Sequence, residues 1–144
     1  MGVTISSKTK EIDLGYFGFN RLRTKVAELC NKEIFDHYNH LKDSIYIFRD
    51  EDVKKFFNEY NKKTKEIDEK YDMKFNAVLH FLYASDCEAS MDVDVCKAIY
   101  EVIKTFDDDK TIYGYSGRSD AAVFNDFKDI VKDCIDNNCA MQWS

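Results

Sequence analysis

Proline is absent from this sequence of 144 residues, and glycine occurs only five times. Turns must therefore be made mainly by Gly, Asn, Asp or Ser, which tolerate or stabilise the backbone angles that a chain reversal needs. No apolar run approaches the roughly 18 residues that a membrane span needs. The N-terminal residues also lack an apolar signal core. We therefore expect a cytoplasmic protein that is neither exported nor inserted in a membrane.

Repeats, linkers and low-complexity tracts are also missing from the sequence. A length of 144 residues is typical of one domain and is enough to bury a core without disulfides or metals. The composition, 44% hydrophobic and 33% charged, is that of a globular protein. These features predict a single globular domain over residues 1–144.

The chain has five cysteines, an odd number, so at least one of them cannot form an intramolecular disulfide. Without a secretory signal, this number favours reduced thiols, most of them buried as small apolar side chains. Structural zinc sites use two closely spaced pairs, and the separations here do not provide them. We expect neither disulfides nor a zinc site. The cysteines are Cys30, Cys87, Cys96, Cys134 and Cys139.

Helical periodicity dominates the sequence and predicts an α+β fold that is mostly helical. In residues 12–29 a strand-like segment passes Gly15 and Gly18 into an amphipathic helix that begins near Phe19. Its apolar face consists of Phe19, Leu22, Val26 and Leu29, and the helix either continues to Leu41 or breaks near Asn31. Further apolar periodicity predicts helices over residues 50–71, 73–83, 94–106 and 119–135, or about five in all. Asn137 and Asn138 suit the left-handed end of the last helix.

A small antiparallel sheet is predicted from shorter alternating segments. Residues 3–5 and 11–14 flank a polar connection and indicate a hairpin. Residues 111–115 predict a further strand, and residues 139–143 are a candidate edge strand. The long predicted helix over residues 50–71 carries an apolar stripe that needs a neighbour along its length. That neighbour is either another part of the chain or a second subunit in a homodimer.

Acidic residues are concentrated in one segment. Residues 86–109 contain eight acids and two lysines, and this difference equals the net charge of −6 of the whole chain. Such a surface repels phosphate backbones, which argues against nucleic-acid binding, and it can dock on a basic protein. The alternative is a solvated face with acids that cap helices. Asp107, Asp108 and Asp109 are our first candidates for partner binding.

Aromatic residues suggest a second candidate surface for a partner. Tyr16 lies near Arg21 and Arg23, and tyrosine and arginine are favoured at recognition surfaces. The alternative is that the aromatic residues here form a hydrophobic staple on the first helix. We therefore name Tyr16, Arg21 and Arg23 as candidates for partner binding.

Two segments resemble metal sites only in part. From Asp86 to Asp94, oxygen-bearing residues alternate as in a calcium loop, but Met91 replaces the glycine of the sixth position and Lys97 the glutamate of the twelfth. Helix capping by the same acids is the alternative. His37 and His40 could share a metal on one helical face, but no acid or thiol accompanies them at fixed spacing. We therefore expect no metal.

The loop over residues 113–120 is the candidate site for a small ligand. It runs from a predicted strand into the start of the last helix, where free backbone donors could bind a phosphate or carboxylate. Tyrosines there could stack on a base. The alternative is ordinary strand–turn–helix geometry, because no P-loop pattern is met. The candidate ligand-binding residues are Tyr113, Tyr115, Ser116, Arg118 and Ser119.

Catalytic machinery is not evident in the sequence, because no local arrangement supplies a nucleophile, a base and oxyanion donors together. We therefore expect a protein that is not an enzyme and needs no cofactor. Our leading hypothesis is a binding protein, and the alternative is a binder of a small anionic nucleotide-like ligand at residues 113–120.

Three stretches resemble a known group of proteins. They are DLGYFGFNRLRTKVAEL at residues 13–29, SDCE at 85–88, and the C-terminal part from YGYSGR at 113–118 through Trp143. In these stretches, about a third of the chain, the sequence is similar to small uncharacterised proteins of bacteriophages and prophages of Gram-positive bacteria. The resemblance implies a phage accessory protein that binds and inhibits a host protein, such as a CRISPR effector or another defence protein.

Overall fold

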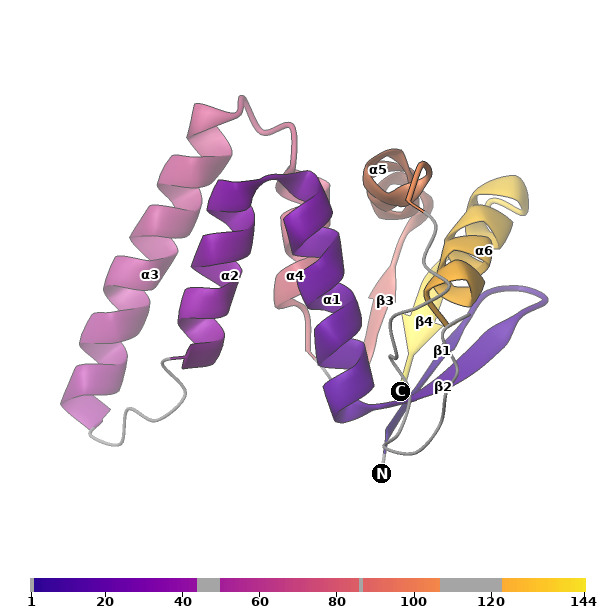
Figure 1. Ribbon diagram of the computed structural model, residues 1–144, viewed down its shortest axis with the longest axis horizontal. Coiled ribbons are helices and arrows are strands. Elements are labelled where there is room, and N and C mark those ends of the chain that lie inside the picture. The colour runs from indigo at the N-terminus through magenta and orange to yellow at the C-terminus, as the bar shows by residue number, and fades with distance from the viewer. Residues whose placement is uncertain (1, 44–49, 86, 107–122) are drawn as a thin grey trace.

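The computed structural model describes residues 2–43, 50–85, 87–106 and 123–144 (Figure 1). Within these residues the chain forms six helices and four strands, which confirms the α+β class with a small antiparallel sheet. In chain order the elements are β1 (Gly2–Ser6), β2 (Glu11–Gly15), α1 (Tyr16–Cys30), α2 (Lys32–Asp43), α3 (Asp50–Lys70), α4 (Asn76–Tyr83), β3 (Ala89–Met91), α5 (Val93–Ile103), α6 (Val123–Asp136) and β4 (Met141–Trp143).

The sheet has the strand order β2-β1-β4-β3, and each neighbouring pair is antiparallel. The predicted hairpin is confirmed as β1 and β2, with Ser6 opposite Glu11 next to the turn. The predicted C-terminal strand is confirmed as β4. It lies between β1 and β3 and is not an edge strand. The strand predicted over residues 111–115 falls outside the described residues.

Strand β3 was not predicted, because residues 86–94 were interpreted as a loop. The strand has only three residues, and only Met91 among them is buried, so the sequence shows no clear alternation. Its ladder is formed with β4, which lies about 50 residues further along the chain. This strand is therefore specified by long-range pairing and hardly at all by local propensity.

The first helix begins three residues earlier than predicted, at Tyr16, directly after Gly15 ends β2. Its predicted inner face is confirmed, because Phe19, Leu22 and Val26 are fully buried. The helix ends at Cys30, and the backbone of the following residue, Asn31, is extended. The Asn31 side chain accepts a 2.8 Å hydrogen bond from the backbone N–H of Ile34. Asn31 therefore caps α2, which confirms the predicted break.

A single hydrophobic core joins the sheet to the helices. Trp143 of β4 belongs to this core, with its ring centroid 5.3 Å from that of Phe19 on α1 and 5.7 Å from that of Phe81 on α4, both edge to face. Its indole N–H donates a 2.9 Å hydrogen bond to the carbonyl of Ser85. Because this side chain is only 3% exposed, it anchors β4 against the helices.

Helix α3 lies at one end of the molecule beside α2, with α1 and α4 next and the sheet, α5 and α6 at the other end (Figure 1). Tyr60 and Ile67 of the predicted stripe are buried, while Phe57 remains 43% exposed. Part of the stripe is therefore covered within the chain itself. Among the described residues, no helix has both the length and the apolar composition to cross a membrane.

Candidate functional site

Alternate residues of the sheet face opposite ways, and this divides it into a buried side and an exposed side. Val3, Ile5, Leu14, Met91, Met141 and Trp143 belong to the core. The residues between them point away from the core, and none of their side chains is buried. We call this exposed side the open sheet face. Its residues are Thr4, Ser6, Glu11, Asp13, Glu88, Ser90, Gln142 and Ser144.

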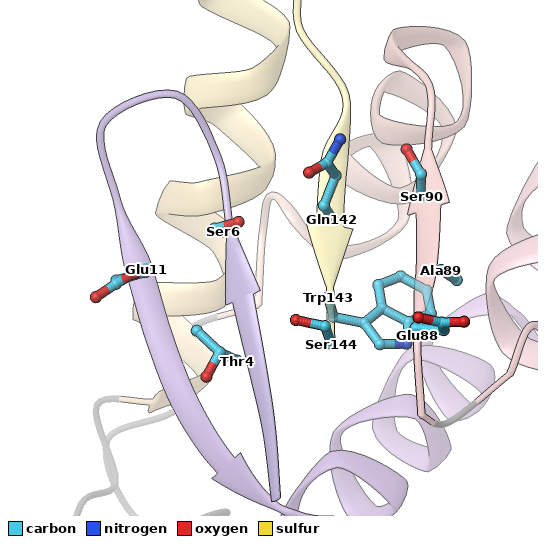
Figure 2. Close-up of a pocket in the computed structure, with 9 residues that line it drawn as sticks. All are labelled: Thr4, Ser6, Glu11, Glu88, Ala89, Ser90, Gln142, Trp143 and Ser144. Atoms are coloured by element: carbon cyan, nitrogen blue, oxygen red, sulfur yellow. The ribbon is translucent and has the colours of Figure 1, made fainter.

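Strand register arranges the open sheet face into two rows that cross all four strands. The first row runs Glu11, Ser6, Gln142, Ser90. The second runs Asp13, Thr4, Ser144, Glu88. Here Thr4 and Ser144 exchange backbone hydrogen bonds of 2.9 and 3.2 Å, and Glu88 lies beside Ser144 (Figure 2). Each row therefore places neutral hydroxyl or amide groups in its centre and a carboxylate on at least one margin.

An open groove of about 640 Å³ lies over this surface (Figure 2). The described residues that line it include two carboxylates and no cationic side chain. Hydroxyl and amide groups can both donate and accept hydrogen bonds, whereas carboxylates only accept. The lining is therefore suited to a ligand rich in donors. The lining residues are Thr4, Ser6, Glu11, Glu88, Ala89, Ser90, Gln142, Trp143 and Ser144.

Negative charge continues beyond the margins of the groove. On the β2 side, Asp13 is exposed and accepts a 2.6 Å hydrogen bond from the hydroxyl of Thr4. On the β3 side, Asp92 and Asp94 follow the strand and are exposed. Asp92 also accepts a 3.0 Å hydrogen bond from the backbone N–H of Val95, as expected for a helix cap. Part of the predicted acidic segment therefore lies beside the open sheet face.

The candidate partner-binding residues on α1 are not brought to one surface. Tyr16 is 37% exposed and Arg21 is exposed, but Arg23 is only 7% exposed. Its Nη1 donates hydrogen bonds of 3.2 and 2.8 Å to the carbonyls of Leu82 and Ala84. These carbonyls lie at the C-terminal end of α4, where backbone acceptors need donors. The expectation that Arg23 contacts a partner is therefore corrected, because its side chain faces inward.

The other predicted site residues lie outside the described residues. These are the acidic partner-binding candidates Asp107, Asp108 and Asp109, and the ligand-binding candidates Tyr113, Tyr115, Ser116, Arg118 and Ser119. Their proposed roles stay predictions.

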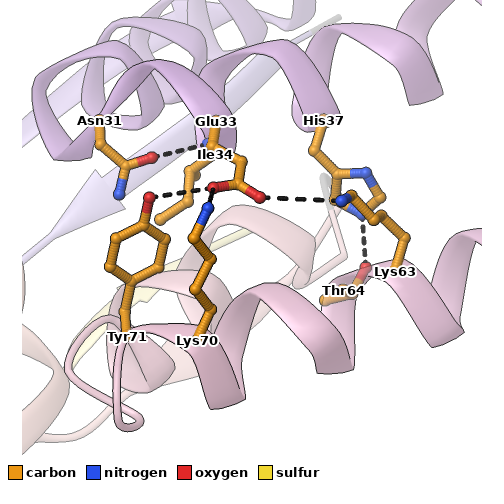
Figure 3. A network of polar contacts seen from close by, with 8 residues as sticks. All are labelled: Asn31, Glu33, Ile34, His37, Lys63, Thr64, Lys70 and Tyr71. Atoms are coloured by element: carbon orange, nitrogen blue, oxygen red, sulfur yellow. Dashed lines mark hydrogen bonds and ion pairs between the residues drawn. The ribbon is translucent and has the colours of Figure 1, made fainter.

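His37 is buried in the contact between α2 and α3 (Figure 3), with 8% of its surface exposed. Its ring stacks on Tyr60 at 3.9 Å between centroids, and its Nε2 lies 2.7 Å from the hydroxyl oxygen of Thr64. That hydroxyl donates its proton to the backbone carbonyl of Tyr60. Nε2 must therefore carry the proton and donate to Thr64. Burial lowers the pKa of His37 to about 4.

Two tyrosine hydroxyls extend this buried network to α4. Tyr60 donates a 2.9 Å hydrogen bond to the carbonyl of His37, so the 2.7 Å contact with Tyr83 is donated by Tyr83. Burial raises the pKa of both tyrosines, to about 12 for Tyr83. A neutral histidine and two protonated phenols do not transfer protons readily near pH 7. The network is therefore suited to holding three helices together.

Glu33 makes the outer part of the same contact (Figure 3). Its carboxylate lies 2.9 Å from Nζ of Lys70, 3.7 Å from Nζ of Lys63 and 3.0 Å from the hydroxyl of Tyr71. Hydrogen bonds from Lys70 and Tyr71 lower the pKa of Glu33. These contacts hold the end of α3 against α2, and they leave Glu33 already paired with cations.

The two segments considered for metal binding serve other contacts. His37 donates to Thr64, whereas His40 lies against Phe56 at 5.5 Å between ring centroids. In the 86–94 segment, Ser90 belongs to the open sheet face and Asp92 caps α5. In the part of the chain that the structure describes, no three His, Cys, Asp or Glu side chains are placed to hold a metal ion.

No protein-family model, curated protein or solved structure matches this chain.

Proposed function

We propose that this chain is a non-enzymatic binding protein that captures a partner protein with a basic surface through the open sheet face. The observation that carries the proposal is the distribution of charge on this face. Carboxylates of Glu11 and Glu88 lie on opposite sides of the groove, and the described lining residues include no cation.

Lysine and arginine side chains match this surface chemically. Carboxylates form their strongest hydrogen bonds with ammonium and guanidinium groups, because both partners are charged. Between the carboxylates, the hydroxyls of Ser6 and Ser90 and the amide of Gln142 can pair with the remaining polar groups of a partner. The side chains stand on paired strands, so little additional ordering of the backbone accompanies binding.

The charge of the open sheet face also determines which partners are excluded. A surface with carboxylates on both sides repels phosphate groups and accelerates encounters with positively charged proteins. The resemblance to phage and prophage proteins extends the proposal to a host protein as the partner, such as a CRISPR or other defence effector that the bound chain would inhibit.

Charge-neutralising variants test the proposal. The double variant Glu11→Gln with Glu88→Gln removes the two carboxylates that line the groove. The control, Glu59→Gln with Glu66→Gln, removes two exposed carboxylates of α3 and changes the net charge equally. Each variant and the unmodified chain is immobilised and exposed to host lysate, and the retained proteins are quantified by mass spectrometry.

The expected result is a specific loss for the groove variant. A partner held by the unmodified chain should bind about three- to tenfold more weakly to the groove variant at low salt, because each surface ion pair contributes up to about 1 kcal/mol. The difference should shrink at high salt. Equal retention by the groove variant and the unmodified chain would refute the proposal, as would equal losses in the two double variants.

A further inference from the structure

Three of the five cysteines gather where α6 ends and β4 begins. Cys96 comes from α5, Cys134 from α6 and Cys139 from the connection between α6 and β4. Burial raises the pKa of Cys134, and interactions with the thiols of Cys96 and Cys139 raise it further. Cys96 and Cys134 are buried, whereas Cys139 is half-buried. The cluster therefore has one member that solvent reaches and two that lie behind it.

The helix end itself brings Cys134 and Cys139 together. Asn138 adopts a left-handed backbone conformation with φ of 51°. The N–H of Cys139 donates a 3.0 Å hydrogen bond to the carbonyl of Cys134, and the N–H of Asn138 donates a 3.3 Å bond to that of Ile135. This is a Schellman motif, in which the first and last residues commonly make an apolar side-chain contact. Here the residues at those two positions are Cys134 and Cys139.

We propose that Cys134 and Cys139 are a thiol–disulfide modification site, which a small-molecule disulfide such as oxidised glutathione converts to an intramolecular disulfide. The backbone hydrogen bond between the two residues holds their main chains close together, as the short Cα separation of a disulfide requires. This inference is independent of the proposed binding function.

The reaction consists of two thiol–disulfide exchanges. Cys139, the more accessible thiol, loses its proton, and its sulfur attacks the oxidised glutathione. The S–S bond of the reagent breaks, one glutathione thiolate leaves, and a mixed disulfide forms on Cys139. Cys134 then loses its proton and attacks the Cys139 sulfur, which releases the second glutathione. In total, two protein thiols become one disulfide, and the reagent is reduced to two glutathione thiols.

The order of attack follows from burial. Desolvation raises the pKa of Cys134 well above its ordinary value, so few of its thiols are ionised near neutral pH. Cys134 is therefore suited to the second step, where the nearby mixed disulfide gives it a high effective concentration. Cys96 is also buried and interacts with Cys134, so it is the alternative partner, which the experiment distinguishes.

Tryptic mapping gives a direct test. Trypsin cleaves after Lys132, so Cys134 and Cys139 fall in one peptide, residues 133–144, whereas Cys96 lies in the peptide that ends at Lys97. The intact chain is incubated with oxidised glutathione, unfolded in N-ethylmaleimide to block remaining thiols, digested and analysed by mass spectrometry. Peptide 133–144 should be lighter than its reduced form by the mass of two hydrogen atoms and should carry no N-ethylmaleimide adduct. Reduction before the alkylation step should give the peptide two adducts.

Two variants separate the specific pair from general oxidation. Cys139→Ser should leave Cys134 open to alkylation after unfolding, whereas Cys30→Ser should behave like the unmodified chain. Burial raises the pKa of Cys30 to about 12, so it is a poor competitor. The proposal is overturned by double alkylation of peptide 133–144 after oxidation, by a persistent mixed disulfide on Cys139, or by a cross-link between this peptide and the Cys96 peptide.

Discussion

Protonation of His37 is expected to destabilise the fold in mildly acidic solution. The pKa of this residue is about 4 in the folded protein, against an ordinary value of 6.5 in the unfolded chain. Between these values the unfolded chain binds more protons than the folded one, so falling pH favours unfolding. The stability associated with neutral His37 is therefore fully present above about pH 6.5 and is lost as the pH falls toward about 4.

The magnitude follows from the size of the shift. Each unit of pKa difference corresponds to about 1.4 kcal/mol, so the whole window amounts to about 3 kcal/mol. Between pH 7 and pH 5 the loss should be about 2 kcal/mol, because at pH 5 the folded protein still holds His37 almost entirely neutral. Glu33 and Asp133 have lowered pKa values, so the stability that depends on their ionisation is lost only at lower pH.

Urea unfolding at pH 7, 6 and 5 measures this effect as the free energy of unfolding. The variant His37→Gln removes the titrating group, so its stability should change much less over the same range. His80, which is exposed on α4, provides the control His80→Gln. If His37→Gln retains the full loss of about 2 kcal/mol between pH 7 and pH 5, the assignment of this pH dependence to His37 is wrong.

Three further substitutions test contacts that join distant segments. Arg23→Met keeps much of the side-chain packing but removes the donor to the end of α4, and chemical denaturation should show a loss of about 2–3 kcal/mol; a loss below about 0.5 kcal/mol would contradict this role. Tyr60→Phe removes the hydroxyl shared by α2 and α4 and should cost about 1–2 kcal/mol, whereas an unchanged midpoint would show that the hydroxyl contributes nothing. Asp133→Asn weakens the hydrogen bonds that the carboxylate accepts from the β1–β2 turn, so its melting temperature should fall at pH 7, and the difference from the unmodified chain should shrink below about pH 4; a difference that is constant with pH would refute an ionic role.

Much of the fold could be predicted from the sequence, because the apolar faces of its helices repeat regularly. Phe19, Leu22 and Val26 form the inner face of α1 as predicted. The hairpin was predicted from alternation and a polar turn. Strand β3 was not, because three residues carry too little pattern to reveal a strand that only pairing with β4 creates.

The candidate site was predictable in parts only. The hairpin pattern already places Thr4, Ser6, Glu11 and Asp13 on one side of two strands, since alternate residues share a face. Gln142 lies beside these residues only because β4 occupies a central position in the sheet, and no local sequence pattern predicts that position. The approach of Cys139 to Cys134 was partly visible, because the predicted left-handed helix end at Asn138 is the geometry that produces it.

The place of β4 in the sheet has a consequence for biosynthesis. This strand joins the hairpin to β3, yet it is the last element of the sheet to leave the ribosome. Until residues 141–143 emerge, the inner edge of β1 is unpaired and β3 lacks its only described partner. The nascent chain therefore carries unpaired strand edges that favour aggregation, and assembly of the sheet must follow synthesis of its final segment.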